Sequence, residues 1–195
     1  MNVLAPQDAR PQPGQAHQAL AHWLAYRVRT FDQRALGALN PRTSRGQIRK
    51  TQAYCEAVRH AETDADRPAF GLTASLFALY HAALPWRDGV RLYGSGDLGQ
   101  ALRRVGTGAF QGPKDPGCQR LFERLVAPGP LHRKEVLLQH AVTRLRTQDR
   151  FPPSWAQLAA DLSGWAARGE PVQDAWAASF WTPAHRTPTR TNGDA

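Results

Sequence analysis

Arginine is the residue type in this chain with the clearest chemical meaning. The sequence holds 25 Lys and Arg residues against 16 Asp and Glu residues, and 22 of the 25 are arginines. Residues 27–59 carry a net charge of +6 and residues 117–150 a net +4, whereas residues 61–116 balance to zero. Guanidinium groups bind phosphates in a fixed, two-pronged geometry. The two basic segments therefore favour a surface for nucleic acid over a basic protein that is merely solvated.

A glycine-rich stretch is the next candidate for chemistry. Residues 94–99 read Gly-Ser-Gly-Asp-Leu-Gly and match the pattern of dinucleotide-binding sites. Such a site needs a buried strand before the glycines, a βαβ unit and an acidic residue about 20 positions later. Residues 90–93 form a poor, arginine-interrupted strand, and no sheet follows. Ser95 or Asp97 as the N-cap of a helix explains the same residues, and that helix start could still hold a phosphate.

No pattern of histidine, cysteine or serine predicts catalysis. The seven histidines form neither an HExxH motif nor a pair at i, i+4 spacing, and the two cysteines, Cys55 and Cys118, lie 63 residues apart. A Gly-x-Ser-x-Gly elbow is absent from the sequence. Asp161, on a helix between Leu158 and Leu162, favours a salt bridge or a solvent contact over a general base. We therefore predict no catalytic residue, no metal site and no cofactor, and expect that the protein is not an enzyme.

The composition predicts the elements that must position these residues. Ala and Leu together number 51, whereas Val and Ile number only 10. The first pair favours helices and the second favours strands. We expect an all-α fold, a compact helical bundle of about eight helices in two packed halves. Apolar residues recur at helical spacing over residues 16–36, 44–61, 70–84, 97–105, 118–127 and 131–147, then from Ser154 to Gly169 and from Pro171 onward. The four C-terminal tryptophans are interpreted as packing residues rather than a stacking platform for bases.

The sequence also predicts how the chain is organised. The uncharged run between Arg67 and Arg87 can form a helix of about 22 Å, which is short of the ~30 Å hydrocarbon core of a membrane. It is interpreted as a buried core helix, and no secretory signal is recognised. We expect a soluble, cytoplasmic protein with disordered tails at residues 1–14 and 182–195. The folded domain should span residues 15–181, with possible halves at 15–106 and 117–181.

Three motifs, taken in order, resemble a known family. Residues 76–79 (Leu-Phe-Ala-Leu) are followed by residues 97–104 (Asp-Leu-Gly-Gln-Ala-Leu-Arg-Arg), and residues 120–125 read Arg-Leu-Phe-Glu-Arg-Leu. The third motif begins at Ser154-Trp155 and ends at Phe180-Trp181. The chain resembles the CasB family, the small subunit of the type I-E CRISPR surveillance complex Cascade, over about residues 23–181. A family Leu-Arg-Arg is replaced here by Leu-Asn-Pro with Arg42 just beyond, and a family basic pair falls near Gln139-His140.

The resemblance implies a non-catalytic, all-helical protein present in two copies within Cascade. It implies contacts with the guide-RNA-bound backbone and large subunits, with the second copy, and with the target and displaced DNA strands of the R-loop. These contacts should read the nucleic-acid backbone, because the target changes with every guide. Binding should weaken with salt, with a log–log slope of roughly −0.7 per phosphate of a single strand. The expected interface residues are Arg67, Arg87, Arg91, Arg103, Arg104, Arg120, Arg124, Arg133, Lys134, Arg144 and Arg146.

The sequence is also compatible with two other functions. The first is a free-standing helical DNA-binding regulator, in which residues 44–61 would form the reading helix of a helix–turn–helix. A good partner helix does not precede that segment across Asn40-Pro41. The second is a purely structural assembly subunit whose charge only buffers the complex.

Overall fold

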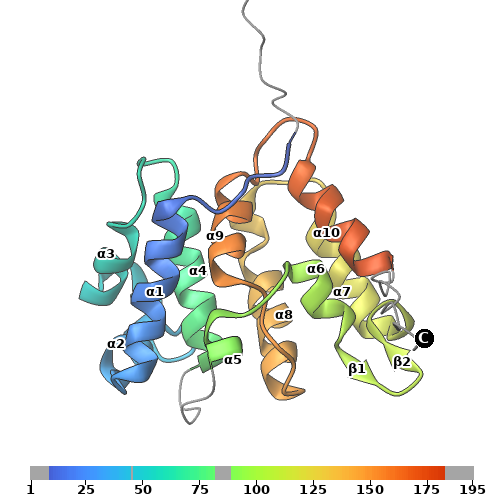
Figure 1. Cartoon of the computed structure of the whole chain (residues 1–195), viewed down its shortest axis with the longest axis horizontal. Coiled ribbons are helices and arrows are strands. Elements are labelled where there is room, and N and C mark those ends of the chain that lie inside the picture. The colour runs from blue at the N-terminus through green and yellow to red at the C-terminus, as the bar shows by residue number, and fades with distance from the viewer. Residues whose placement is uncertain (1–8, 45, 82–88, 183–195) are drawn as a thin grey trace, which may run out of the picture.

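The protein is helical throughout most of the computed structural model, which describes residues 9–44, 46–81 and 89–182 (Figure 1). The all-α prediction is confirmed, with ten α-helices in the described residues rather than about eight. The α-helices are α1 (Gln15–Arg29), α2 (Gln33–Leu39), α3 (Gln52–Val58), α4 (Arg67–His81), α5 (Gly89–Tyr93), α6 (Leu98–Arg103), α7 (Pro116–Val126), α8 (Glu135–Thr147), α9 (Trp155–Ser163) and α10 (Pro171–Trp181). The other elements are the 3-10 turns η1 (Ile48–Lys50), η2 (Gly112–Lys114) and η3 (Leu131–Arg133) and the strands β1 (Gly106–Thr107) and β2 (Phe110–Gln111).

Helix α4 is the core of the fold, as its uncharged sequence predicts. Every residue from Ala69 to His81 is buried, and α1, α3, α8 and α9 pack around the helix. A helix that is apolar on all sides needs such cover. Its two hydroxyl residues are satisfied locally, because Thr73 donates to the carbonyl of Ala69 and Ser75 to that of Gly71. The expected end at Leu84 lies outside the described residues. Among the described helices, none has the length and apolarity needed to cross a membrane.

The first expected helix, residues 16–36, is wrong as a single element. Helix α1 ends at Arg29, and Phe31 takes a left-handed backbone conformation with φ 54°. The Asp32 carboxylate then accepts a hydrogen bond from the backbone N–H of Ala35 and caps α2. Aspartate competes for backbone N–H groups in this way and so favours a new helix start over continuation. This break, together with α5 in a segment expected to be a loop, raises the number of helices.

The second expected helix, residues 44–61, is also shorter than the pattern indicates. Ser44 does not cap a helix, and its hydroxyl has no hydrogen-bond partner among the described residues. The chain instead forms η1, and Thr51 caps α3 by accepting from the N–H of Tyr54.

The glycine-rich stretch at residues 106–117, between the two expected halves, contains regular secondary structure. It forms a β-hairpin in which Gly106 pairs with Gln111 and Thr107 with Phe110. Gly112 has φ 52°, and a Cβ there would lie 2.5 Å from the Arg103 carbonyl oxygen. Glycine is therefore required where the hairpin turns back onto α6.

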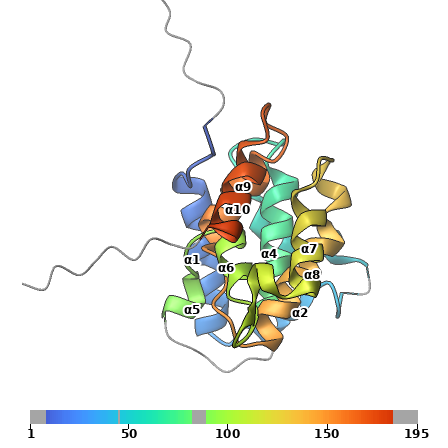
Figure 2. The same ribbon diagram turned by 90° about the vertical axis from the view of Figure 1, so that its right-hand side faces the viewer.

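The regions on either side of this hairpin share one core. Helix α6 packs against α10, and α9 packs against α1 and α4. Figure 1 shows α9 between the N-terminal helices and the group formed by α6, α7 and α10, and Figure 2 shows the molecule from the side of that group. Three of the C-terminal tryptophans, at 155, 165 and 176, are buried as expected, whereas Trp181 is 44% exposed.

Part of the expected N-terminal tail belongs to this packed body. The Arg10 guanidinium lies 2.6 Å from the carboxylate of Asp161 and 3.1 Å from that of Asp97. Asp161 is fully buried and also accepts hydrogen bonds from Trp176 and Gln157. The salt bridge predicted for Asp161 is confirmed. Its partner, Arg10, anchors residues 10–14 against α6 and α9.

Candidate nucleic-acid interface

A basic groove lies between α7 and α8. Its volume is about 400 Å³. Arg120, Leu121 and Arg124 reach it from α7, and Arg144 reaches it from α8. Acidic residues are absent from its lining, which is completed by Gly117, His140 and Thr143. We refer to this hollow as the α7–α8 groove.

The sequence of α7 explains which side chains reach the groove. The Asp115 carboxylate accepts from the N–H groups of Gly117 and Cys118, and this cap fixes the start of the helix. Phe122 and Leu125 are fully buried on the core face. With that face buried, Arg120 and Arg124, one turn apart, lie on the exposed side and share it.

The helix α8 has the same division into a core face and an exposed edge. Leu138, Ala141, Val142 and Leu145 are fully buried. Arg144 lies beside this stripe, as the helical pattern predicts. Its Nη2 would lie 2.7 Å from a Cβ at position 117, so the glycine there allows the guanidinium to approach α7 closely.

The charges in the groove are poorly compensated. The side chains of Arg120 and Arg124 are exposed and form neither a hydrogen bond nor an ion pair with the described residues. The closest Arg144–Asp115 approach is 3.9 Å, and Arg144 Nη1 has no hydrogen-bond partner in the described part of the chain. The exposed guanidinium groups of Arg120 and Arg124 can still receive phosphate oxygens as new partners.

A family model and a solved structure show what this chain is similar to. The family model for CRISPR-associated protein Cse2 matches residues 33–181. The chain belongs to the Cse2 family. Its fold is similar to the crystal structure of CasB from Thermobifida fusca, with a TM-score of 0.62 and 17% sequence identity over 88% of this chain and 100% of that chain. A search of curated proteins gave no match. The predicted family is confirmed, and membership in it supports a place as a subunit of the CRISPR Cascade complex.

Two residues of the groove region in this Cse2 chain were missed among the expected interface residues. The Arg42 guanidinium donates to the Thr143 hydroxyl at 3.0 Å and so adds a cation at the rim of the groove. His140 lines the groove itself. A signal for both was present in the sequence, since Arg42 follows the replaced family Leu-Arg-Arg and His140 falls at the family's basic pair.

Three of the expected interface residues use their side chains inside the fold. Arg103 donates to the carbonyl of Phe180 at 2.6 Å, and Arg146 donates to that of Leu79 at 2.8 Å. Lys134, only 5% exposed, donates to the carbonyls of Arg124 and Ala127. All three cations thus bind carbonyls at or near the C-terminal ends of helices, where positive charge is stabilising.

Burial has a further consequence for Lys134. It lowers the pKa of the ammonium, an effect that Glu170 partly opposes. A buried ammonium that already donates to two carbonyls is poorly placed to bind a phosphate. Arg133, the preceding residue, is exposed, and its side chain forms no hydrogen bond or ion pair with described residues, so the guanidinium is available.

Three further expected residues, Arg67, Arg91 and Arg104, do not line the groove. Arg67 is paired with Asp64 at 2.9 Å on the surface. Arg91 is held by both oxygens of Asp149 and lies 4.7 Å above the ring of Phe151. Arg104 is half-buried at the end of α6. Arg87 lies outside the described residues.

The glycine-rich stretch has a structural role that agrees with its interpretation as a cap. Asp97 is the N-cap of α6, and its carboxylate accepts from the N–H of Gln100 at 2.8 Å. Gly99 lies so close to α10 that a Cβ would be 2.1 Å from the carbonyl oxygen of Trp176. Within the described residues, no group of three or more His, Cys, Asp or Glu side chains could hold a metal ion.

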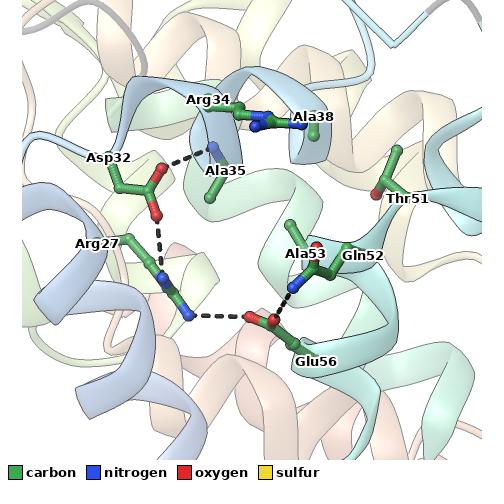
Figure 3. Close-up of a pocket in the computed structure, with 9 residues that line it drawn as sticks. All are labelled: Arg27, Asp32, Arg34, Ala35, Ala38, Thr51, Gln52, Ala53 and Glu56. Atoms are coloured by element: carbon green, nitrogen blue, oxygen red, sulfur yellow. Dashed lines mark hydrogen bonds and ion pairs between the residues drawn. The ribbon is translucent and has the colours of Figure 1, made fainter.

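A second hollow contains arginines but has a different charge balance. Figure 3 shows the pocket between α1, α2 and α3, which has a volume of about 340 Å³. Arg27 lies between two carboxylates and pairs with Asp32 and Glu56, each at 2.9 Å. Arg34 lies at the side of this pocket, and three alanines complete much of its wall. We refer to it as the α1–α3 pocket.

Proposed function

We propose that this chain is the non-catalytic small subunit of type I-E Cascade, and that it binds nucleic-acid backbone without sequence specificity to stabilise the R-loop. The observation that carries the proposal is the α7–α8 groove, with three guanidinium groups and an acid-free lining. Arginines directed at phosphates hold a strand without reading its bases. R-loop formation exchanges a DNA duplex for a hybrid of similar stability, so a few backbone contacts can shift the balance.

The proposal includes the expected partners. The subunit would act in the cytoplasm in two copies, beside the guide-bound backbone and large subunits, and would contact the target and displaced strands. The folded domain of residues 15–181 would carry these contacts. In the groove we assign the backbone contacts to Arg120, Arg124 and Arg144, with Arg42 at the rim. Arg133 is a further candidate, because it is exposed near the start of α8.

The decisive experiment is permanganate footprinting of a matched DNA target bound by reconstituted Cascade, with and without this chain. We expect the displaced strand to open fully, or to stay open longer, only when the chain is present. A complex with Arg120→Gln and Arg124→Gln should lose R-loop lifetime by about fivefold per lost contact at 0.1 M salt.

The matched control removes the same charge elsewhere. Arg59→Gln with Arg168→Gln changes two exposed arginines outside the groove, and this pair should leave the lifetime unchanged. Equal losses from both pairs would show that only net charge matters, which is the buffering role of a purely structural subunit. An unchanged footprint without the chain would refute the proposal.

The alternative of a free-standing DNA-binding regulator finds little support in the described structure. The segment expected to read a duplex contains only a 3-10 turn and the short helix α3, whose residues Gln52–Val58 include no Arg or Lys. Tight binding to one duplex sequence over a scrambled duplex would favour the regulator. Equal binding to unrelated single strands would favour the Cascade subunit.

A further inference from the structure

The β-hairpin, η2 and the end of α10 enclose a cavity of about 340 Å³ that no part of the proposed function uses. Its wall contains one large aromatic side chain, Trp181, and two basic ones, Arg103 and Lys114. Acidic residues are absent from its lining, and Gln111 and small residues of the hairpin complete it. This volume lies within the range of ligand sites in proteins, about 300–1,000 Å³.

Trp181 differs from the other C-terminal tryptophans in its exposure. Trp155, Trp165 and Trp176 are at most 3% exposed, whereas Trp181 is 44% exposed. Its ring nevertheless has fixed neighbours: the rings of Phe180 and Phe122 meet it at 83° and 82°, with centroids 5.0 and 6.2 Å away. A half-exposed ring held by edge-to-face contacts can offer its free surface without losing much side-chain freedom on binding.

One of the two cations beside this ring is also held in place. Arg103 donates from Nη1 to the Phe180 carbonyl, which fixes the guanidinium at the end of α10 and offsets the negative end of that helix. Lys114 is exposed at the end of η2, with neither a hydrogen bond nor an ion pair in the described residues. An aromatic surface next to fixed positive charge suits a base with its attached phosphate.

We propose that this cavity binds one unpaired nucleotide of a single strand, with its base stacked on Trp181 and its phosphate held by Arg103 and Lys114. Every base has a π-face, so stacking of this kind does not depend on sequence. Lys114 lies two residues before α7, the helix that carries Arg120 and Arg124 of the α7–α8 groove. The inference rests on the proposed function and specifies a base contact beside the backbone contacts.

The test compares two single strands of equal charge, a 12-nucleotide oligo(dT) and a 12-mer in which every base is missing. The full chain should bind oligo(dT) about tenfold more tightly than the abasic strand, as expected from one stacked base. Trp181→Leu keeps an apolar side chain but removes the flat ring and should abolish this preference. Trp181→Phe should retain part of it. Oligo(U) of the same length shows which sugar is favoured, and a preference for either base-bearing strand supports the site.

The matched control is Phe110, which is 68% exposed on the same hairpin but does not line the cavity. Phe110→Ala should keep the full preference for oligo(dT) over the abasic strand. Loss of the preference in this variant would indicate nonspecific binding by apolar residues of the hairpin and would overturn the proposal. Gln111→Glu changes an exposed cavity residue without touching the core, so it decides the question if Trp181→Leu fails to fold. Its carboxylate should weaken oligo(dT) binding about fivefold, and unchanged binding would overturn the proposal.

The result separates this inference from the proposed function. Equal binding of the wild type to both strands would overturn base stacking and leave the backbone contacts of the groove intact. Failure to bind either strand would overturn both.

Discussion

The α7–α8 groove and the α1–α3 pocket are hollows of similar size, and both are lined by arginines, yet their chemistry differs. The groove, at about 400 Å³, has three arginines and no acidic side chain in its wall. The pocket, at about 340 Å³, has two arginines and two carboxylates, and Arg27 pairs with both carboxylates. Figure 1 shows α1, α2 and α3 on one side of the molecule and α7 on the other.

The difference shows that an arginine becomes a phosphate ligand through its neighbours and not through its type. In the pocket the carboxylates already occupy the Arg27 guanidinium, so an incoming phosphate would have to displace them. In the groove, Arg120 and Arg124 have no such partner among the described residues, so a phosphate adds contacts without removing any. The pocket stabilises the fold, and the groove is available for a ligand.

The largest change in affinity for oligo(dT) is expected when two arginines of the groove are replaced. The same replacement in the pocket should have little effect. We expect Arg120→Gln with Arg124→Gln to weaken oligo(dT) binding by about 25-fold at 0.1 M salt, since each lost phosphate contact costs about fivefold there. Arg27→Gln with Arg34→Gln should change the affinity less than twofold. Fluorescence anisotropy with labelled oligo(dT) measures both. Equal losses in the two pairs would contradict the comparison.

A smaller change in oligo(dT) affinity is expected when the two carboxylates of the pocket are neutralised, so that its lining, like that of the groove, has no acidic residue. Asp32→Asn with Glu56→Gln removes both carboxylates, and asparagine still caps α2. Arg27 and Arg34 would then be uncompensated, and we expect oligo(dT) affinity to rise about fivefold, the value of one added phosphate contact. Adding Arg34→Gln to this variant should reverse the gain in the same titration. No gain at all would mean that shape and not charge excludes a strand from the pocket.

The smallest effect should be on the free energy of unfolding. Here the pocket arginine should matter more than the groove arginine. Arg27→Ala should lower the free energy of unfolding by about 1 kcal/mol, because it removes two partly exposed ion pairs and a contact over the Trp23 ring. Arg120→Ala should change it by less than about 0.5 kcal/mol, as is usual for an unpaired surface residue. Urea unfolding followed by circular dichroism measures both values. A larger cost at Arg120 would show that the groove arginines also support the fold.

Much of the fold could be predicted from local patterns. The uncharged core helix, the cap at Asp97 and the inward faces of α7 and α8 all follow from spacing and residue type, because each depends on neighbours within one or two turns. The ends of the first two expected helices could not be predicted in this way. Phe31 adopts a left-handed conformation that its residue type disfavours, and Ser44 remains without the helix that it could cap.

The candidate site could be predicted only in part. Adjacent residues Arg133 and Lys134 are equally basic in sequence, but the first is exposed and the second is buried against the end of α7. The difference depends on where the carbonyls of α7 end, which is a property of the packed structure. Arg42 joins the groove region from 101 residues away in the chain, through Thr143.

The sequence by itself determined the all-α class, the core helix, the two basic segments and the family, because composition, periodicity and motif order are local properties of the chain. The tertiary structure alone decided which cations donate hydrogen bonds to the rest of the fold and which do not. A guanidinium or ammonium group binds the nearest acceptor that packing provides. For Arg103, Lys134 and Arg146 that acceptor is a backbone carbonyl. For Arg120 and Arg124 the described fold provides none, so they can bind a ligand.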